Sequence, residues 1–299
     1  MRVDPHFAAN LTGGLEQIQS TEQTLTSELS SGVRVSSPGI DPLAAGDNVE
    51  LTAQISQDDS FNQTAVTEES RLQVADSALG AVVTQLTQAI TLATQAGSGT
   101  ENASNLQSIG SQLGSIRDAV LGLANSSYQG SYLFGGSATS TQPYTLDTST
   151  TPPTAVYSGD TATQTLVTPQ GQSITVSAPG SSIFSAAGAD VLGTLNALAA
   201  QLSTGSAGTG LAAQVAQLTA GLNNVSAQRI PLDTALTTLQ SAATYSQTQA
   251  TALTAAQTTL IGADTAQVAT QLSQAETQSQ ALMAVISTIE KGSLFDYTH

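Results

Sequence analysis

The chain has 299 residues, and only 9% of them are charged, with 22 acidic and 6 basic side chains that give a net charge of −16 at pH 7. A chain this acidic, with no basic patch, is unsuited to binding nucleic acid or an anionic membrane surface. Because cysteine is absent, a disulfide framework and a thiolate metal site are excluded as well.

The first predicted element is a helix over residues 4–29. Asp4 is placed to be its N-cap and Pro5 its first helical residue, and Gly32 follows as the C-cap. Its apolar residues share one face, at spacings of three, four and seven: Phe7, Leu11, Leu15, Ile18, Leu25 and Leu29. Residues 31–46 contain two prolines and three glycines, which predict an ordered loop.

Two further helices are predicted over residues 49–96 and 106–125. Asp47 is placed to cap the first, in which apolar residues recur at spacings of three and four. The glycines at positions 97 and 99 end it, and the short connection predicts an antiparallel helical hairpin. The helical pattern stops at residues 130–137, where two aromatic residues lie between glycines.

A change of pattern follows, because residues 144–184 contain short β-branched segments separated by proline and glycine turns. This pattern predicts a small unit of β-hairpins. Helix resumes near Asp190. After the flexible stretch 203–210, the apolar spacing from Leu211 to Leu239 predicts a third long helix, kinked at Pro231, that covers the hairpin and forms a bundle.

The last fifty residues carry a heptad seam, read as one long helix from Leu253 to Ile289. This helix cannot bury its apolar stripe on itself, and the helix of residues 4–29 has the same period, so the two chain ends are expected to pair. The sequence predicts a mainly α fold: a long-helix coiled coil and a helical rod formed by paired termini, with a small inserted β domain. The predicted domains are a terminal coiled-coil inner domain (1–46 and 250–299), a helical rod domain (47–136 and 190–249) and a small exposed β-hairpin domain (137–189).

Two helices that pair alone leave part of each apolar stripe exposed and are marginally stable in water. We therefore expect the chain ends to be disordered in a monomer and to fold as they assemble with other copies. The predicted assembly interface consists of Leu11, Leu15, Ile18, Leu25, Leu29, Val268, Leu272, Leu282, Ile286 and Ile289.

Residues for catalysis are scarce. The only histidines are His6 and His299, and the single lysine, Lys291, is placed to compensate a helix dipole. No glycine-rich phosphate loop and no calcium loop is present. The sequence therefore predicts no enzyme, no catalytic residue, no metal and no cofactor. The first residues lack the apolar core of a cleaved signal peptide, and no stretch is long enough to span a membrane.

The sequence motifs resemble the flagellin family over almost the whole chain. The resemblance rests on Met1-Arg2-Val3, on Ser30-Ser31-Gly32-Val33-Arg34 followed by Asp41-Pro42, on Tyr132-Leu133-Phe134-Gly135-Gly136, and on Leu294-Phe295-Asp296-Tyr297. The Ser-Ser-Gly-x-Arg stretch of residues 30–34 is shared with filament flagellin. The Tyr-Leu-Phe-Gly-Gly and Leu-Phe-Asp-Tyr segments are similar instead to the members that join the flagellar hook to the filament. The motif residues that we single out are Gly32, Arg34, Asp41, Pro42, Tyr132, Phe134, Gly135 and Phe295.

The resemblance implies a structural subunit of the bacterial flagellum, located outside the cell and exported without a cleaved signal peptide by the flagellar type III export apparatus. It implies a homo-oligomeric ring between the first hook-filament junction protein and filament flagellin, and an export chaperone before assembly. Departures are few: Gly13 and Gly14 interrupt the first stripe, and the β unit is short.

Two alternatives stay open. A filament flagellin is the alternative within the family, although a filament subunit would end in a plain leucine-rich helix. A secreted adhesin or hydrolase that acts through the β unit is the alternative outside it. The missing nucleophile, base and metal set argues against the hydrolase, and the small size of the insertion argues against the adhesin.

Overall fold

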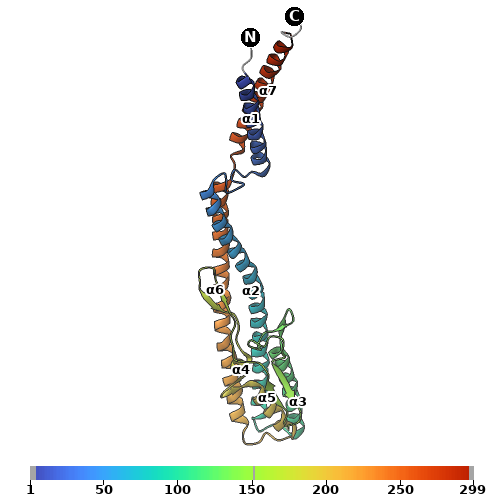
Figure 1. Ribbon diagram of the computed structural model, residues 1–299. Helices are drawn as coiled ribbons and strands as arrows, with labels where there is room; N and C mark the ends of the chain where they lie inside the picture. The colour runs from blue at the N-terminus through green and yellow to red at the C-terminus, as the bar shows by residue number, and fades with distance from the viewer. Residues whose placement is uncertain (1–4, 151, 296–299) are drawn as a thin grey trace. The chain divides into compact units, whose positions relative to one another are not determined.

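The computed structural model describes residues 5–150 and 152–295, with only the helical backbone described for residues 5–8 and 289–295. The described helices are α1 (Pro5–Ser31), α2 (Pro42–Ala96), α3 (Ala103–Ala124), α4 (Gly180–Phe184), α5 (Val191–Ser203), α6 (Leu211–Ile261) and α7 (Thr265–Phe295) (Figure 1). The chain forms two compact units, one of Met1–Gln57 with Gln249–His299 and one of Asp58–Thr248. We refer to them as the terminal unit and the central unit. The mainly α fold with long helices is confirmed, whereas the division into three domains remains a prediction.

Helix α2 begins earlier than the sequence analysis predicted. The predicted cap was Asp47, but the helix starts at Pro42 and Asp41 caps it. The Asp41 carboxylate accepts a hydrogen bond from the Ala44 backbone N–H at 3.1 Å. The fixed φ of Pro42 suits the first helical position, where a backbone N–H has no helical partner. The predicted loop is therefore shorter, and it ends at Asp41.

The single helix predicted from Leu253 to Ile289 is wrong, because the chain breaks between α6 and α7. Helix α6 ends at Ile261, and Val33 forms an isolated antiparallel bridge with Gly262. A Cβ atom at position 262 would lie 2.3 Å from the Thr258 carbonyl oxygen, so only glycine fits there. The Asp264 carboxylate then caps α7 by accepting from the backbone N–H groups of Ala266 and Gln267 at 3.0 and 3.1 Å. Leu253 and Leu260 therefore belong to α6.

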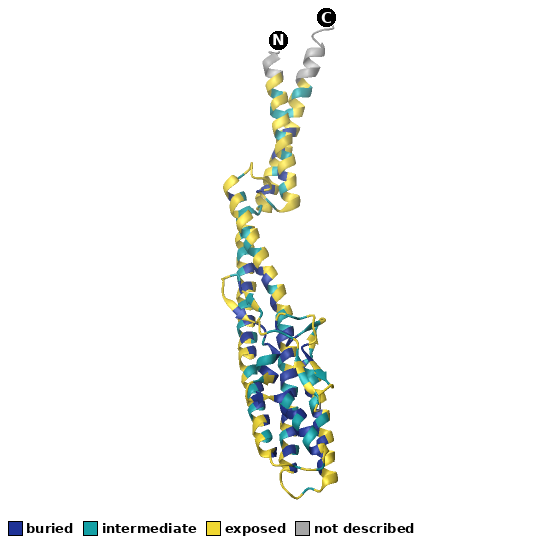
Figure 2. Cartoon of the chain, turned by 60° about the horizontal axis from the view of Figure 1, so that its bottom comes forward, coloured by how far each residue is buried: buried dark blue, intermediate teal, exposed yellow. Residues whose placement is uncertain are grey.

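The core of the central unit lies among α2, α3, α5 and α6. Each helix contributes a stripe of leucine, isoleucine, valine and alanine at helical spacing, and the buried residues concentrate among these helices in Figure 2. Fully buried examples are Leu79 and Leu86 of α2, Leu113 of α3, Leu198 of α5 and Leu239 of α6. The predicted bundle is confirmed, with α5 as an additional member.

Helices α3 and α5 approach closely at Gly110. A Cβ atom there would lie 2.8 Å from the Ser203 backbone nitrogen and 3.2 Å from the Ala199 carbonyl oxygen. We expect Gly110→Ala to destabilise the central unit by about 1–3 kcal/mol, because the added methyl group meets backbone that cannot rotate away. Urea unfolding followed by circular dichroism measures the change.

Gly114, one turn further along α3, supplies the matched control. A Cβ atom at this position meets nothing within 4 Å. We expect Gly114→Ala to stabilise the unit by about 1 kcal/mol, because alanine has the higher helix propensity. Equal effects of the two substitutions would contradict the close approach of α3 and α5 at Gly110.

The strands of the described residues form four antiparallel hairpins, each a two-stranded sheet. They pair β1 (Ser127–Tyr128) with β2 (Ser131–Tyr132), β3 (Tyr144–Asp147) with β4 (Thr154–Tyr157), β5 (Thr165–Val167) with β6 (Ser173–Thr175), and β7 (Ser185–Ala186) with β8 (Ala189–Asp190). Their buried side chains, such as Tyr144 and Ile174, belong to the same hydrophobic cluster as the helices. The predicted β unit is present, and it shares the core of the central unit.

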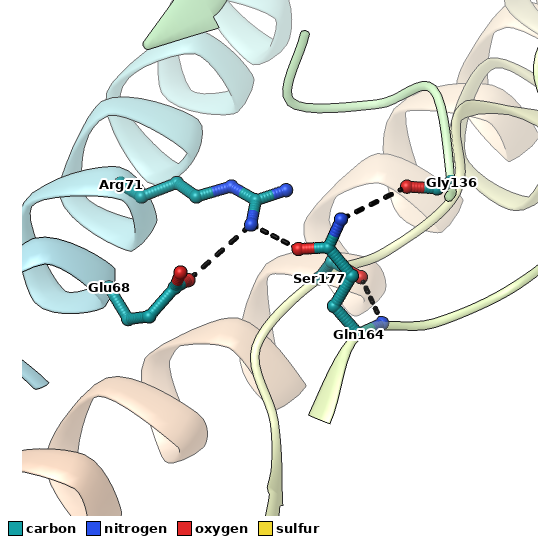
Figure 3. A network of polar contacts seen from close by, with 5 residues as sticks. All are labelled: Glu68, Arg71, Gly136, Gln164 and Ser177. Atoms are coloured by element: carbon teal, nitrogen blue, oxygen red, sulfur yellow. Dashed lines mark hydrogen bonds and ion pairs between the residues drawn. The ribbon is translucent and has the colours of Figure 1, made fainter. Parts of the chain in front are cut away.

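A polar network joins the hairpin segment to α2 (Figure 3). The Arg71 guanidinium lies 3.5 Å from the Glu68 carboxylate and donates to the side-chain oxygen of Gln164. The Gln164 backbone N–H donates to the Ser177 hydroxyl at 2.7 Å, and its side-chain amide donates to the Gly136 carbonyl at 3.4 Å. Because Arg71 is buried, these partners offset part of the cost of removing its charge from water, and its Nη2 atom has no hydrogen-bond partner among the described residues.

Candidate assembly surface

The terminal unit contains a two-helix coiled coil of α1 and α7, which lie side by side (Figure 1). Leu25 of α1 is buried together with Val268 and Ala275 of α7. Further toward the N-terminus of α1, a Cβ atom at Gly14 would lie 3.7 Å from the Leu282 Cδ2 atom. The contacts move toward the C-terminus of α7 as they move toward the N-terminus of α1, so the helices are antiparallel. The predicted pairing of the chain ends is confirmed.

The hydrophobic core of this pair is thin. Ile18, Ala263 and Leu272 pack on the three buried residues as half-buried neighbours. The other predicted interface residues are half-buried (Leu11, Leu15, Leu282 and Ile286) or exposed (Leu29, 39%), and the side chain of Ile289 lies outside the described residues. Met283 and Val285 of α7 are 46% and 45% exposed. Apolar side chains of α1 and α7 therefore stay exposed to solvent in the pair. Contact of these side chains with other copies remains a prediction.

Gly32 ends α1. It belongs to the stretch Ser30–Arg34 with Asp41-Pro42, which we call the first motif. Gly32 has φ +68°, a conformation that favours glycine. Its backbone N–H donates to the Glu28 carbonyl at 2.8 Å, and its own carbonyl accepts from the Ala263 N–H at 2.9 Å. Gly32 is thus both the predicted C-cap of α1 and a partner of the segment that links α6 to α7.

Arg34 also binds the end of α6, next to the segment that links α6 to α7. Its backbone N–H donates to the Ile261 carbonyl at 2.8 Å, and its guanidinium donates to the Leu260 carbonyl at 3.2 Å. A cation at these carbonyls also suits the negative end of the α6 dipole. The guanidinium lies 3.7 Å from the Asp41 carboxylate, which caps α2 beside Pro42. The first motif therefore brings three helix ends together.

We expect Arg34→Ala to loosen this junction locally. The Leu260 carbonyl loses a charged donor and the exposed ion pair with Asp41 is removed, so the opening free energy at the Ala263 amide should fall by about 1 kcal/mol. Hydrogen exchange of that amide measures the change. Arg117→Ala, in the central unit, is the control and should leave the amide unchanged. Equal protection of Ala263 in the native protein and in Arg34→Ala would show that Arg34 does not hold the linking segment.

The second motif, Tyr132–Gly136, lies inside the central unit. The Phe134 ring is buried edge-on to Phe184, with centroids 5.4 Å apart, and its carbonyl accepts from the Gly180 N–H at 2.8 Å. A Cβ atom at Gly135 would lie 2.8 Å from the Ala138 carbonyl oxygen. Tyr132 is half-buried in β2. These motif residues shape the junction of helices and hairpins, whereas Phe295 of the last motif has its side chain outside the described residues.

A carboxylate closes the glycine turn after Phe134. Asp160 accepts hydrogen bonds from the Ser137 backbone N–H at 2.8 Å, from the Ser137 hydroxyl, and from the Ala162 N–H at 2.9 Å. The Ser137 hydroxyl, followed by the two backbone donors, lowers the pKa of Asp160 below its ordinary value. The hydrogen bonds to the Asp160 carboxylate therefore stabilise the fold. Their contribution is present above the unfolded-state pKa of Asp160 and is lost as the pH falls through its folded-state pKa.

No chemical site emerges beside these structural contacts. Within residues 5–150 and 152–295, acidic and histidine side chains form no group of three that could hold a metal ion. None of the helices in the described part of the chain is both long and apolar enough to cross a membrane.

Comparison with known proteins finds similarity to flagellar proteins. Residues 6–139 match the bacterial flagellin N-terminal helical region. Flagellar hook-associated protein 3 of Salmonella typhimurium is 30% identical over 132 residues, which make up 44% of this chain and 42% of that protein. The match therefore covers less than half the length of this curated relative.

Solved structures share the fold. FlgL of Bacillus cereus has a TM-score of 0.56 and 22% identity over 70% of this chain and 97% of that chain. The flagellar junction protein FlgL of Legionella pneumophila has a TM-score of 0.58 and 15% identity over 72% of this chain and 99% of that chain. At such identities the structures establish the fold alone. Together with the match at residues 6–139, they confirm the resemblance to the flagellin family that the motifs predicted.

Proposed function

We propose that this protein is a structural subunit of the bacterial flagellum that forms the junction between hook and filament and assembles through its terminal helices. The observation that carries the proposal is the thin α1–α7 pair, which retains exposed apolar residues such as Met283 and Val285. A surface of this kind is stabilised when other copies cover it. The name of the Salmonella relative, a hook-associated protein, supports the junction as the location.

The resemblance to junction members of the family supplies the partners of this proposal. They are copies of the chain in a ring, the first hook-filament junction protein on one side, and filament flagellin on the other. Before assembly, an export chaperone would hold the chain for the flagellar type III apparatus. The family is one of structural flagellar proteins, and the proposed role is mechanical rather than enzymatic.

A strain that lacks this chain tests the proposal. We expect it to make hooks and to release filament subunits into the medium, because the filament has no surface on which to grow. Returning the native chain should restore filaments. Filaments of normal length in the deletion strain would contradict the junction role. If normal filaments are composed mainly of this chain and the deletion strain makes no filament protein, this chain is a filament flagellin.

A further inference from the structure

The seam between α1 and α7 carries a charged residue at its middle. Seam positions on α1 recur at spacings of four and three over residues 11–29, and those on α7 follow the same spacings in reverse over residues 268–286. The antiparallel contacts described above align the two series, because Leu25 packs with both Val268 and Ala275. The resulting layers are Leu11–Ile286, Leu15–Leu282, Ile18–Ser279, Glu22–Ala275, Leu25–Leu272 and Leu29–Val268.

Glu22 occupies a seam position at which an apolar side chain would close the layer. It follows Ile18 by four residues and precedes Leu25 by three, and both of these neighbours belong to the apolar cluster of the pair. Glu22 is half-buried, and it forms no ion pair with a described side chain. Opposite it, Ala275 is buried but supplies only one methyl group. The layer therefore pairs a carboxylate with the smallest apolar side chain of the seam.

A hollow beside Glu22 keeps its carboxylate accessible to water. The hollow has a volume of about 750 Å³, and its other lining residues, such as Gln19 and Gln23, carry amide or hydroxyl groups. Because a carboxylate is costly to remove from water, this side of the layer stays hydrated. The next layer also adds little apolar contact, since the buried Ser279 stands opposite Ile18. Two consecutive layers thus contribute less apolar contact than a layer of two leucines.

We propose that Glu22 prevents α1 and α7 from forming a stable pair in the free chain, so that their pairing depends on further contacts. Closing the layer as tightly as that of Leu25 would remove the carboxylate from water without a cation to compensate it. A leucine at position 22 would instead enlarge a core that has only three buried residues. Glutamate and leucine have similar helix propensities, so the difference lies in the seam and not in α1 itself.

Hydrogen exchange of the full chain at a concentration where it is monomeric tests the proposal. We expect Glu22→Leu to slow exchange of the amides of residues 10–30 and 265–288 about tenfold, because a buried leucine side chain raises the free energy of opening. Glu22→Gln removes the charge but leaves an amide that still needs hydrogen-bond partners, so we expect it to slow exchange less, about threefold. Exchange in the central unit, which has its own core, should be the same in all three proteins.

Glu16→Leu is the matched control for the loss of one negative charge from α1. Glu16 lies on the same helix as Glu22, but it is exposed and outside the seam. We expect Glu16→Leu to leave exchange of the terminal helices unchanged. All variants are compared at a concentration at which sedimentation velocity finds them monomeric, because association would slow exchange for a different reason.

Three results would overturn the inference. They are strong protection of the terminal helices in the native monomer, equally rapid exchange in the native chain and in Glu22→Leu, and slowing by Glu16→Leu as large as that by Glu22→Leu. In the last case net charge, and not the seam position, would control the pair.

The inference goes beyond the proposed function, because it concerns the chain before it meets any partner. Equally rapid exchange in the native chain and in Glu22→Leu would leave the junction role intact, since that role is decided by the filaments of the deletion strain. Conversely, normal filaments in that strain would contradict the junction role, while slower exchange in Glu22→Leu would still support the inference.

Discussion

Replacing Phe184 by alanine is expected to lower the free energy of unfolding of the central unit by about 3–5 kcal/mol. The Phe184 side chain is fully buried, and its ring meets those of Phe134 and Tyr144 edge-on, with centroids 5.4 and 5.8 Å apart. The substitution removes these ring contacts and leaves a cavity where the second motif, the hairpins and α4 meet. Urea unfolding followed by circular dichroism measures the loss.

Val167→Ala is the control at an exposed position, because Val167 lies in β5 and its side chain is 58% exposed. Its effect should be within about 0.5 kcal/mol. A loss for Phe184→Ala no larger than that for Val167→Ala would show that the aromatic cluster does not hold the hairpins to the helices.

Val268→Asp is expected to abolish incorporation of the chain into flagella while leaving the central unit folded. Val268 is 5% exposed in the small cluster that joins α1 and α7. A carboxylate at this position would be buried without a partner, which the thin helix pair cannot offset. The central unit has its own hydrophobic cluster, so its thermal unfolding should be unchanged. Quantitative immunoblotting of purified flagella measures incorporation.

Thr270→Asp, at an exposed position of α7, is the matched control and should enter flagella normally. Normal incorporation of Val268→Asp would mean that pairing of α1 with α7 is not needed for assembly. A large fall in the melting temperature of the central unit would mean that the two clusters are not independent.

The sequence alone predicted the helices and their partners where apolar periodicity was strong. The common heptad period of residues 4–29 and the last fifty residues predicted that the ends pair, and Leu25 and Val268 do meet. The β-branched segments around Tyr144 and Ile174 likewise predicted hairpins that the structure contains. Both patterns repeat over several residues, so a single exception does not hide them.

The start of α2 and the break between α6 and α7 were predicted wrongly, because each depends on a single residue that allows more than one interpretation. Asp47 and Asp41 can both cap a helix, and only the hydrogen bond to Ala44 identifies Asp41. A glycine such as Gly262 is tolerated within a helix, so the break before α7 was missed. The sequence did contain a signal, because glycine followed by Asp264 matches a C-cap and the next N-cap.

The partners of the motif residues could not be predicted because they are backbone groups far along the chain. Arg34 donates to the carbonyl of Leu260, and any residue type at that position would offer the same acceptor. The close approach at Gly110 likewise depends on the backbone of α5. Such contacts have no signature in side-chain pattern, and they require the fold to be known.

Hydrogen exchange of the terminal helices, compared between dilute protein and isolated flagella, tests the assembly role most directly. We predict that amides of residues 10–30 and 265–288 exchange rapidly in the dilute monomer, where the thin α1–α7 pair opens readily, and become protected in flagella. Amides of the central unit should be protected in both samples. Equal and strong protection of the terminal helices in the dilute monomer would contradict the role, because helices already stable alone would not need other copies to cover them.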